Sequence, residues 1–184
     1  MLILASKSAR RIKLLQDAGF TFKVVESQVD EESVDITRPK ELTLELAKLK
    51  AMSVAVMYPE DTVIGADTVV VYEDEILGKP KDEEDAYRML KKLSGETHVV
   101  YTAVVIIQKD KIKTLLAEAE VSMKPITDFE IYNYIETGEP MDKAGSYAIQ
   151  GEGGKLVDNY KGDFFTIVGL PLKDVVEALK EFSF

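Results

Sequence analysis

Residues 62–72 have the sequence Thr-Val-Ile-Gly-Ala-Asp-Thr-Val-Val-Val-Tyr. Such an apolar, β-branched run predicts a buried strand. Asp67 does not fit the pattern, because an ionised carboxylate is costly to bury unless it is paired, hydrogen-bonded or bound to a metal. Gly65 and Ala66 lack bulk and leave room for another group to approach the backbone beside it. The stretch therefore predicts a central strand that carries a candidate active-site carboxylate.

A lysine returns close to this strand in a predicted hairpin. Residues 76–80, Ile-Leu-Gly-Lys-Pro, follow a short turn and place Lys79 on its far side. A carboxylate within a strand and a lysine brought near it are typical of an active site. The alternative is that Asp67 caps a turn between two strands and that Thr68 starts the second strand. The local pattern leaves both interpretations open.

The composition indicates a globular protein with one domain or two small lobes. The chain has 184 residues, of which 46% are hydrophobic and 30% are charged, as in proteins with a proper core. It has no cysteine and a single histidine, His98, which excludes disulfides, thiolate metal sites and multi-histidine metal sites. A divalent metal would therefore need carboxylate and ligand oxygens, which suit Mg²⁺ or Mn²⁺.

The charge distribution narrows the choice of partners. A net charge of −10 argues against nucleic acid as a partner, although a local basic cluster can still bind a phosphate ligand. The first residues are apolar and basic residues follow them, which is the reverse of a signal peptide. No apolar run is long enough to cross a bilayer. We therefore expect a cytoplasmic protein with no nucleic-acid or membrane partner.

A strand, a polar turn and a helix open the chain. Residues 2–5 predict a short buried strand, and the helix that follows has Ser8 as its N-cap. Free N–H groups at a helix start bind anions, and arginine adds bidentate phosphate contacts. The alternative is a capped helix with a solvated basic first turn, although cations at that end oppose the helix dipole. The polar and cationic side chains of this turn are Ser6, Lys7, Ser8, Arg10 and Arg11.

The remaining hydrophobic patterns mix helices with strands. They predict helices over about 37–58, capped by Thr37, and over about 82–94, 127–137 and 172–182. They predict strands over 22–25, 98–107, 117–123, 157–160 and 164–168. With at least one antiparallel hairpin, this mixture predicts an α/β or α+β fold rather than a strict βαβ array. We interpret His98 as a residue at a strand edge whose hydrogen bonds are satisfied, and not as a catalytic base.

Two polar stretches lie outside these elements. Residues 30–33, Asp-Glu-Glu-Ser, form either a solvated loop or a set of metal ligands. Residues 142–154 are rich in glycine and contain Asp142, Lys143 and Gln150. Such a segment suits close approach to a ligand, and the alternative is a flexible hairpin.

Four motifs, taken together and in this order, resemble the Maf family, the septum-formation-type nucleotide pyrophosphatases. They are residues 4–11, Leu-Ala-Ser-Lys-Ser-Ala-Arg-Arg; Gly-Ala-Asp at 65–67 with Gly-Lys-Pro at 78–80; residues 93–98 leading to Thr102; and residues 142–151 with Val-Gly-Leu-Pro at 168–171. The resemblance covers residues 1–184 as a single domain. It implies an elongated α/β fold similar to the inosine triphosphate pyrophosphatases, with a mixed sheet in two lobes around a central cleft. Ala9 departs from the family, which usually has proline there.

The resemblance also implies an activity, which is hydrolysis of a nucleoside triphosphate to the monophosphate and pyrophosphate with a divalent metal, Mg²⁺ or Mn²⁺. It implies Asp67 as the proton acceptor, and Glu31 and Asp67 as the metal ligands. In the branch that acts on dTTP and UTP, three specificity positions match Arg11, Thr68 and Gln150. The substrate-binding residues that it implies are Ser6, Ser8, Arg10, Arg11, Thr68, Lys79 and Gln150.

Two functions of different classes follow from these observations. The first is a pyrophosphatase that removes dTTP and UTP in nucleotide house-cleaning or cell-division arrest. The alternative is a non-catalytic, nucleotide-binding regulator of septum formation. The presence of Asp67, Lys79 and the arginine pair favours the enzyme, for which we expect a homodimer in the cytoplasm.

Overall fold

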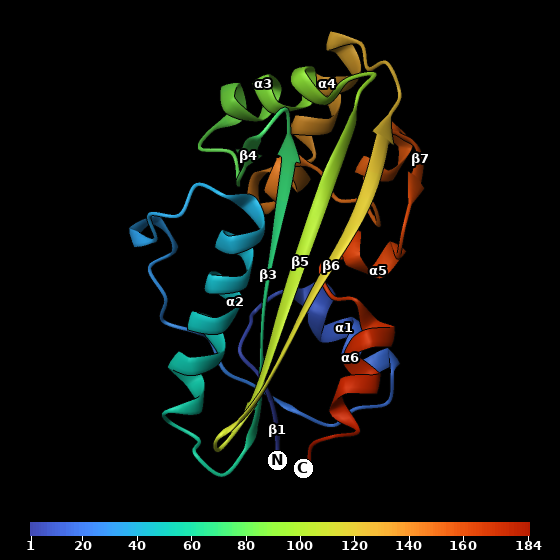
Figure 1. The fold of residues 1–184 in the computed structure, drawn as a ribbon. Helices are drawn as coiled ribbons and strands as arrows, with labels where there is room; N and C mark the ends of the chain where they lie inside the picture. The colour runs from blue at the N-terminus through green and yellow to red at the C-terminus, as the bar shows by residue number, and fades with distance from the viewer. The chain divides into compact units, whose positions relative to one another are not determined.

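The computed structural model describes residues 1–184 and has a mixed α/β fold built on a seven-stranded sheet (Figure 1). The strand order is β2-β1-β3-β5-β6-β7, and β4 pairs with β3. The strands are β1 (Leu2–Leu4), β2 (Lys23–Val24), β3 (Thr62–Tyr72), β4 (Glu75–Leu77), β5 (Thr97–Gln108), β6 (Lys111–Met123) and β7 (Val157–Lys161). β1 runs parallel to β2 and β3, whereas the β3–β4 and β6–β7 pairs are antiparallel. The mixed sheet predicted from the sequence is confirmed.

Six α-helices and four short 3₁₀ segments complete the chain. The α-helices are α1 (Ala9–Asp17), α2 (Pro39–Ala55), α3 (Glu83–Leu93), α4 (Asp128–Glu136), α5 (Phe164–Val168) and α6 (Leu172–Leu179). The 3₁₀ segments are η1 (Glu31–Ser33), η2 (Glu139–Asp142), η3 (Ala144–Ser146) and η4 (Glu152–Leu156). None of the helices combines the length and the apolar character that a membrane span requires.

The chain forms two compact units, and the three long strands β3, β5 and β6 contribute residues to both. Unit 1 contains residues 1–68, 102–117 and 169–184, and unit 2 contains residues 69–101 and 118–168. Asp67 and the basic turn belong to unit 1, whereas Lys79 and Gln150 belong to unit 2. The single domain over 1–184 and the central cleft stay predictions.

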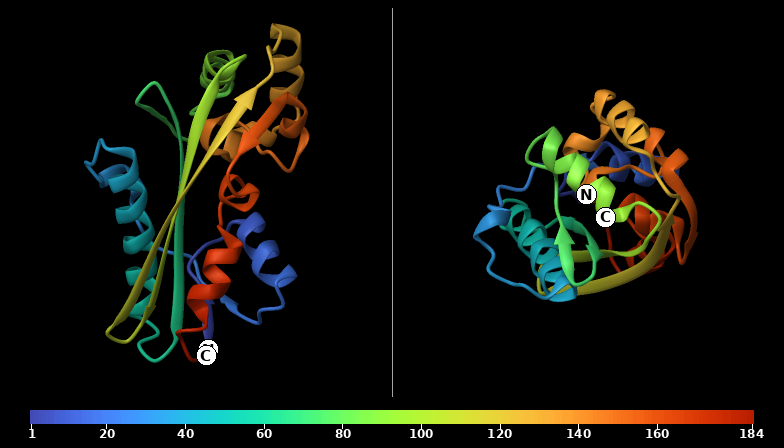
Figure 2. Two further views of the ribbon diagram at one scale, coloured as in Figure 1. Left: turned by 45° about the vertical axis from the view of Figure 1, so that its right-hand side comes forward. Right: turned by 90° about the horizontal axis from the view of Figure 1, so that it is seen from above.

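In unit 1, helices cover both faces of the sheet. Figure 2 shows α2 on one face, and α1 and α6 side by side on the other. Small residues let α2 approach closely, because Ala47 and Ala51 pack against Ala103 and Val105 of β5. A Cβ atom on Gly65 would lie 2.5 Å from the carbonyl oxygen of Ala47 and 2.5 Å from the amide nitrogen of Ala51. The room that the sequence predicts beside Gly65 is therefore filled by the backbone of α2.

The central strand β3 runs through Asp67 without a break. It begins at Thr62 and ends at Tyr72, as predicted. The turn that follows lies at Glu73 and Asp74, which both have positive φ angles of 48° and 64°. The alternative interpretation, in which Asp67 caps a turn between two strands, is therefore wrong.

In unit 2, α3 and α4 pack together over a shared apolar core. Side chains cap both N-termini: Asp82 accepts a hydrogen bond from the amide of Asp85 at 2.8 Å, and Thr127 and Glu130 form a capping box. The rings of Tyr87 and Tyr132 stack with their centroids 5.1 Å apart. The buried members of this core include Leu90, Leu93, Val121, Ile131 and Ile135.

Two predictions about local structure are wrong. Residues 164–168 form the short helix α5 and not a strand, because Asp163 accepts hydrogen bonds from the amide and the hydroxyl of Thr166 at 3.0 and 3.1 Å. This capping contact outweighs the β propensity of an aromatic and β-branched run. Thr37 does not cap α2 either, since the N-cap residue is Arg38 and Pro39 is the first helical residue.

His98 is buried inside unit 2, and only one of its two ring nitrogens has a hydrogen-bond partner. Its exposed fraction is 1%, and its Nε2 atom lies 2.7 Å from the hydroxyl of Tyr147. Its Nδ1 atom has no hydrogen-bond partner, so the prediction of a satisfied strand-edge histidine is wrong. Burial lowers the pKa of His98 from 6.5 to about 4, because the protonated ring would lose its hydration.

We expect this buried histidine to make stability depend on pH. Between pH 6.5 and 4 the unfolded chain binds the proton and the folded chain does not, so the free energy of unfolding falls as the pH falls. Lowering the pKa from 6.5 to about 4 corresponds to about 3 kcal/mol. Because the chain has one histidine, proton NMR of a tag-free sample reports it directly. A titration midpoint near 4 is expected, and a midpoint near 6.5 would contradict the burial.

Candidate active site

The centre of the candidate site is an ion pair between β3 and α2. Asp67 has an exposed fraction of 6%, and its Oδ1 atom lies 2.7 Å from Nζ of Lys50. Burial raises the pKa of Asp67, and the charges of Lys50 and Arg11 offset part of this effect. Its Oδ2 atom is buried and has no hydrogen-bond partner. An unpartnered buried carboxylate oxygen is rare and destabilising, which marks this atom as the place where a proton or a cation can be received.

Lys50 also contacts a second carboxylate. Its Nζ atom lies 2.8 Å from Oε1 of Glu31, whose side chain is 47% exposed. Glu31 begins the short η1 segment, in which the hydroxyl of Ser33 donates to the carbonyl oxygen of Asp30 at 2.7 Å. Lys50 thereby brings together Glu31 and Asp67, the two carboxylates that the family resemblance implies as metal ligands.

The sequence contains a pattern that indicates which side of α2 Lys50 faces, although we did not use this pattern to predict its role. Lys50 follows Leu46 by four residues and precedes Val54 by four, so it lies on the buried face of α2. A buried lysine needs a buried acid to compensate its charge. The strand pattern offers one such acid, Asp67.

The two carboxylates fit a hard divalent cation in their chemistry. Magnesium is commonly held by one or two carboxylates together with substrate phosphates and water. No group of three or more acidic or histidine side chains in the structure is placed so that it could hold a metal ion without other ligands. A metal held by Glu31 and Asp67 would therefore depend on oxygen atoms of the substrate and water to complete its coordination.

Arg11 lies beside this centre in a network of hydrogen bonds within unit 1. Its guanidinium donates to the carbonyl oxygen of Gly169 at 2.7 Å, to the hydroxyl of Thr68 at 3.0 Å and to that of Ser6 at 3.4 Å. The hydroxyl of Thr68 lies 2.9 Å from that of Thr102 on β5. Arg11 is buried, and this network fixes Thr68 next to Asp67. Thr102 was not among the predicted site residues, although one of the sequence motifs ends on it.

A backbone conformation that favours glycine supports this network. Gly169 has a φ angle of +121°, and a Cβ atom there would lie 3.4 Å from the hydroxyl oxygen of Thr68 and 3.6 Å from Nε of Arg11. The left-handed backbone presents the carbonyl oxygen of Gly169 to Arg11 without a side chain in between. The Val-Gly-Leu-Pro motif thus completes the surroundings of Arg11.

The predicted polar turn has the expected local structure. Ser8 caps α1 by accepting a hydrogen bond from the amide of Arg11 at 3.5 Å, and Ser6 accepts one from the amide of Ser8 at 3.2 Å. Ala9 is the first residue of the helix. Arg10, the second residue of α1, is half-buried. The structure therefore brings Ser6, Ser8 and Arg11 together with Thr68, and shows that both serines shape the turn.

The two remaining predicted residues belong to unit 2. Lys79 is exposed in the turn after β4, and Gln150 is exposed within the glycine-rich segment 142–154. A hydrogen bond from the amide of Gly145 to the carbonyl oxygen of Gly78, at 3.1 Å, ties these two motifs together. The roles of Lys79 and Gln150 toward a substrate stay predictions.

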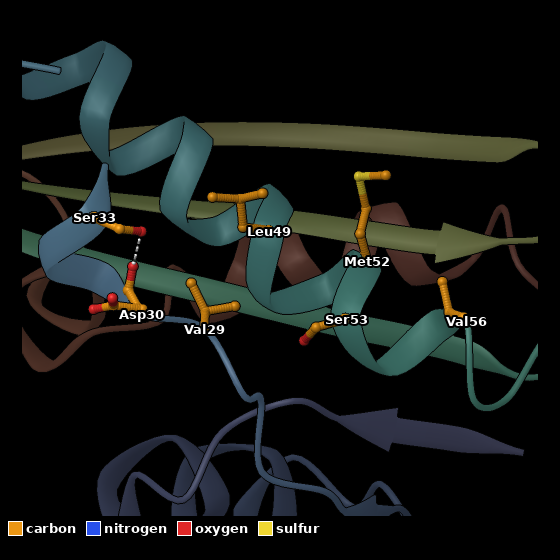
Figure 3. A pocket seen from close by; sticks show the side chains of 7 residues that line it. All are labelled: Val29, Asp30, Ser33, Leu49, Met52, Ser53 and Val56. Carbon is orange, nitrogen blue, oxygen red and sulfur yellow. Dashed lines mark hydrogen bonds between the residues drawn. The ribbon is translucent and has the colours of Figure 1, made fainter. Parts of the chain in front are cut away.

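A separate cavity of about 430 Å³ lies on the outer side of α2 (Figure 3). Its apolar walls come from Leu49, Met52 and Val56 of α2 and from Val29 in the segment before η1. Asp30, Ser33 and Ser53 complete the lining. The lining includes Asp30 and Ser33 of the polar stretch 30–33, but neither Asp67 nor Lys50.

Comparisons with known proteins find relatives over nearly the whole chain. A dTTP/UTP pyrophosphatase of Acholeplasma laidlawii is 49% identical over 184 residues, which cover 100% of this chain and 97% of the relative. A dTTP/UTP pyrophosphatase of Bacillus cereus is 47% identical over 182 residues, covering 99% and 90% of the two chains. The structure of a HAM1 protein from Coxiella burnetii matches with a TM-score of 0.50 at 13% identity and covers 98% of both chains, which shows a common fold. Residues 1–182 match the family model for Maf-like proteins, and the chain belongs to this family.

Proposed function

We propose that the protein hydrolyses dTTP and UTP to the nucleoside monophosphate and pyrophosphate. The observation that carries the proposal is the buried, unpartnered Oδ2 atom of Asp67, held next to Lys50 and Glu31. Relatives that are 47–49% identical over nearly the whole chain are named dTTP/UTP pyrophosphatases, which supports the substrate class. A non-catalytic nucleotide-binding regulator has no need for a carboxylate kept in this environment, so we favour the enzyme.

In the proposed reaction a water molecule attacks the α-phosphorus. The water gives a proton to Oδ2 of Asp67, its oxygen forms a bond to phosphorus, and the bond from that phosphorus to the α,β-bridging oxygen breaks. Pyrophosphate leaves with the bridging oxygen. Lys50 donates a hydrogen bond to Oδ1 of Asp67 and thereby fixes the orientation of the carboxylate. Oδ2 is left to accept the proton from the water. A divalent metal held by Glu31 and Asp67 would supply charge neutralisation and a more acidic bound water.

The triphosphate carries several negative charges, and we assign their neutralisation to the cations of the predicted site. Arg10 at the start of α1 and Lys79 in the turn after β4 are the proposed phosphate contacts. Ser6 and Ser8 shape the helix start, where free N–H groups attract anions. Arg11 is buried in its hydrogen-bond network, so we propose that it acts in specificity by holding Thr68 and not as a mobile phosphate clamp.

Gln150 is the residue that we propose to recognise the base. Its side chain is exposed and makes no hydrogen bond within the chain, so no contact in the structure ties it to a purely structural role in its own loop. An amide offers both a donor and an acceptor, which suits a uracil or thymine edge with one N–H and two carbonyl groups. A carboxylate at this position would lack the donor.

A substrate panel with Mg²⁺ or Mn²⁺ tests this assignment. We expect pyrophosphate from dTTP and UTP and much less from GTP, because a site built on polar partners penalises a mismatched base. In Gln150→Glu, kcat/KM for dTTP and UTP should fall about tenfold or more, as expected when a polar group of the bound base loses its hydrogen-bond partner. Unchanged substrate ratios together with a lower melting temperature would assign Gln150 a structural role. Release of orthophosphate alone, or no turnover with tight nucleotide binding, would contradict the proposed reaction. The homodimer and the cytoplasmic location stay predictions.

A further inference from the structure

The glycine-rich loop that carries Gln150 closes around two side chains of unit 2. Tyr134 of α4 donates its hydroxyl hydrogen to Oε2 of Glu139 at 2.5 Å, and the same hydroxyl oxygen accepts from the amide of Ala148 at 3.1 Å. The carboxylate of Glu139 accepts from the amide of Glu152 at 3.1 Å and from that of Gly153 at 3.0 Å. Backbone on both sides of Gln150 is therefore bonded to one tyrosine–glutamate pair.

Close contact explains two glycines of this loop. A Cβ atom on Gly151 would lie 1.8 Å from Oε1 of Glu139, and one on Gly153 would lie 2.5 Å from the hydroxyl oxygen of Tyr134. Neither position can carry a side chain unless the pair moves. The loop therefore follows the shape of the Tyr134–Glu139 pair and is not a free, flexible hairpin.

The charge of Glu139 suits this task. Burial disfavours the ionised form, but the hydrogen bonds from Tyr134, Gly153 and Glu152 outweigh it and lower the pKa of Glu139. Its carboxylate is therefore ionised at neutral pH, and charge-assisted bonds to backbone amides are stronger than neutral ones. Gly138 has a φ angle of 75°, and this left-handed turn after α4 places Glu139 back beside Tyr134.

We propose that Tyr134 and Glu139 are positioning residues for substrate specificity, which hold the backbone on both sides of Gln150 so that its amide meets the edge of a uracil or thymine base. The inference rests on the proposed function, because it takes Gln150 as the residue that recognises the base. Gln150 makes no hydrogen bond of its own to the loop, so its orientation depends on the backbone beside it. Neither Tyr134 nor Glu139 touches the substrate in this proposal.

The test measures kcat and KM for dTTP, UTP and CTP with Tyr134→Phe and Glu139→Gln. For both variants we expect KM for dTTP and UTP to rise about tenfold while kcat changes less than about threefold, because lost preorganisation weakens binding and leaves the chemistry intact. The preference for dTTP over CTP should fall by a similar factor, about tenfold. Hydrogen exchange of the amides in 148–154 should accelerate, and that of the amides in α3 should not change.

Tyr87→Phe is the matched control. It also removes a tyrosine hydroxyl that donates to a carboxylate in unit 2, that of Asp128 at 2.9 Å, but it does not touch the loop. It should leave KM and the substrate ratios as in the wild type. If Tyr134→Phe and Glu139→Gln lower only the melting temperature and match Tyr87→Phe in kinetics, the positioning role is overturned.

Gln150→Ala separates this inference from the proposed function. If Gln150→Ala lowers the dTTP preference but Tyr134→Phe and Glu139→Gln do not, only the positioning role fails. If Gln150→Ala itself leaves the substrate ratios unchanged, then Gln150 does not recognise the base, and the fault lies in the proposed function. Combining Glu139→Gln with Gln150→Ala should add little to the effect of Gln150→Ala alone, because both changes remove one interaction.

Discussion

Replacing Asp67 with asparagine will abolish turnover and leave the fold intact. The asparagine carbonyl oxygen can still accept the hydrogen bond from Lys50, so the contact between β3 and α2 is kept. The side chain can no longer accept a proton from water. We expect kcat to fall about 10²-fold or more, as is typical when a general base is lost.

Asp17→Asn is the matched control for this experiment. Asp17 lies on α1 in unit 1, and its exposed carboxylate pairs with Lys13 at 3.0 Å. The control should retain full activity, and circular dichroism should show both variants folded. A folded Asp67→Asn protein with near-normal kcat would remove Asp67 from the catalytic role.

Replacing Lys50 with methionine will destabilise the protein strongly at neutral pH. The change leaves Asp67 buried without its cation, and breaking a buried pair in this way costs about 3–5 kcal/mol. Without Lys50 the pKa of Asp67 rises further above its value in the unfolded chain. At low pH Asp67 is protonated in the folded protein and stabilises it relative to the unfolded chain, and this stabilisation is lost as the pH rises. The deficit in the free energy of unfolding should therefore shrink as the pH falls.

Urea unfolding of four proteins tests this expectation. Lys48→Met, a change at an exposed lysine of the same helix, should alter the free energy of unfolding by less than about 0.5 kcal/mol. The double variant Lys50→Met/Asp67→Asn should recover most of the loss, because replacing both partners removes the unpaired charge. If Lys50→Met alone behaves like Lys48→Met, the pair contributes nothing to stability.

The sequence predicted β3 and its carboxylate because both signals are local. A β-branched run between polar residues predicts a strand at any place in a chain, and one acid within it stands out against the pattern. The Ser8 N-cap was predicted in the same way, since a cap depends on residues within one helical turn.

The partner of Asp67 could not be predicted with the same rules. The spacing from Leu46 and Val54 places Lys50 on the buried face of α2, but only the packing of the helix against β3 brings Lys50 to Asp67. That packing depends on Gly65 and on the small side chains of Ala47 and Ala51. Looking for a buried acid to compensate each lysine on the buried face of a helix would have identified Asp67 as the partner of Lys50.

The error at residues 164–168 has a different cause. The segment has the composition of a strand, and its helical state depends on Asp163, which lies outside the predicted element and caps its first turn. The Tyr134–Glu139 pair was missed for a related reason. Its partners in 148–153 are backbone amides, which leave no mark in the sequence except for the glycines that fit around the pair.

Hydrolysis of dTTP in ¹⁸O-labelled water tests the central claim most directly. If water attacks the α-phosphorus next to Asp67, the label will appear in the nucleoside monophosphate, and the pyrophosphate will carry none. Mass spectrometry of the two products from a single-turnover reaction distinguishes them. Label in the pyrophosphate would place the attack on the β-phosphorus and contradict the account.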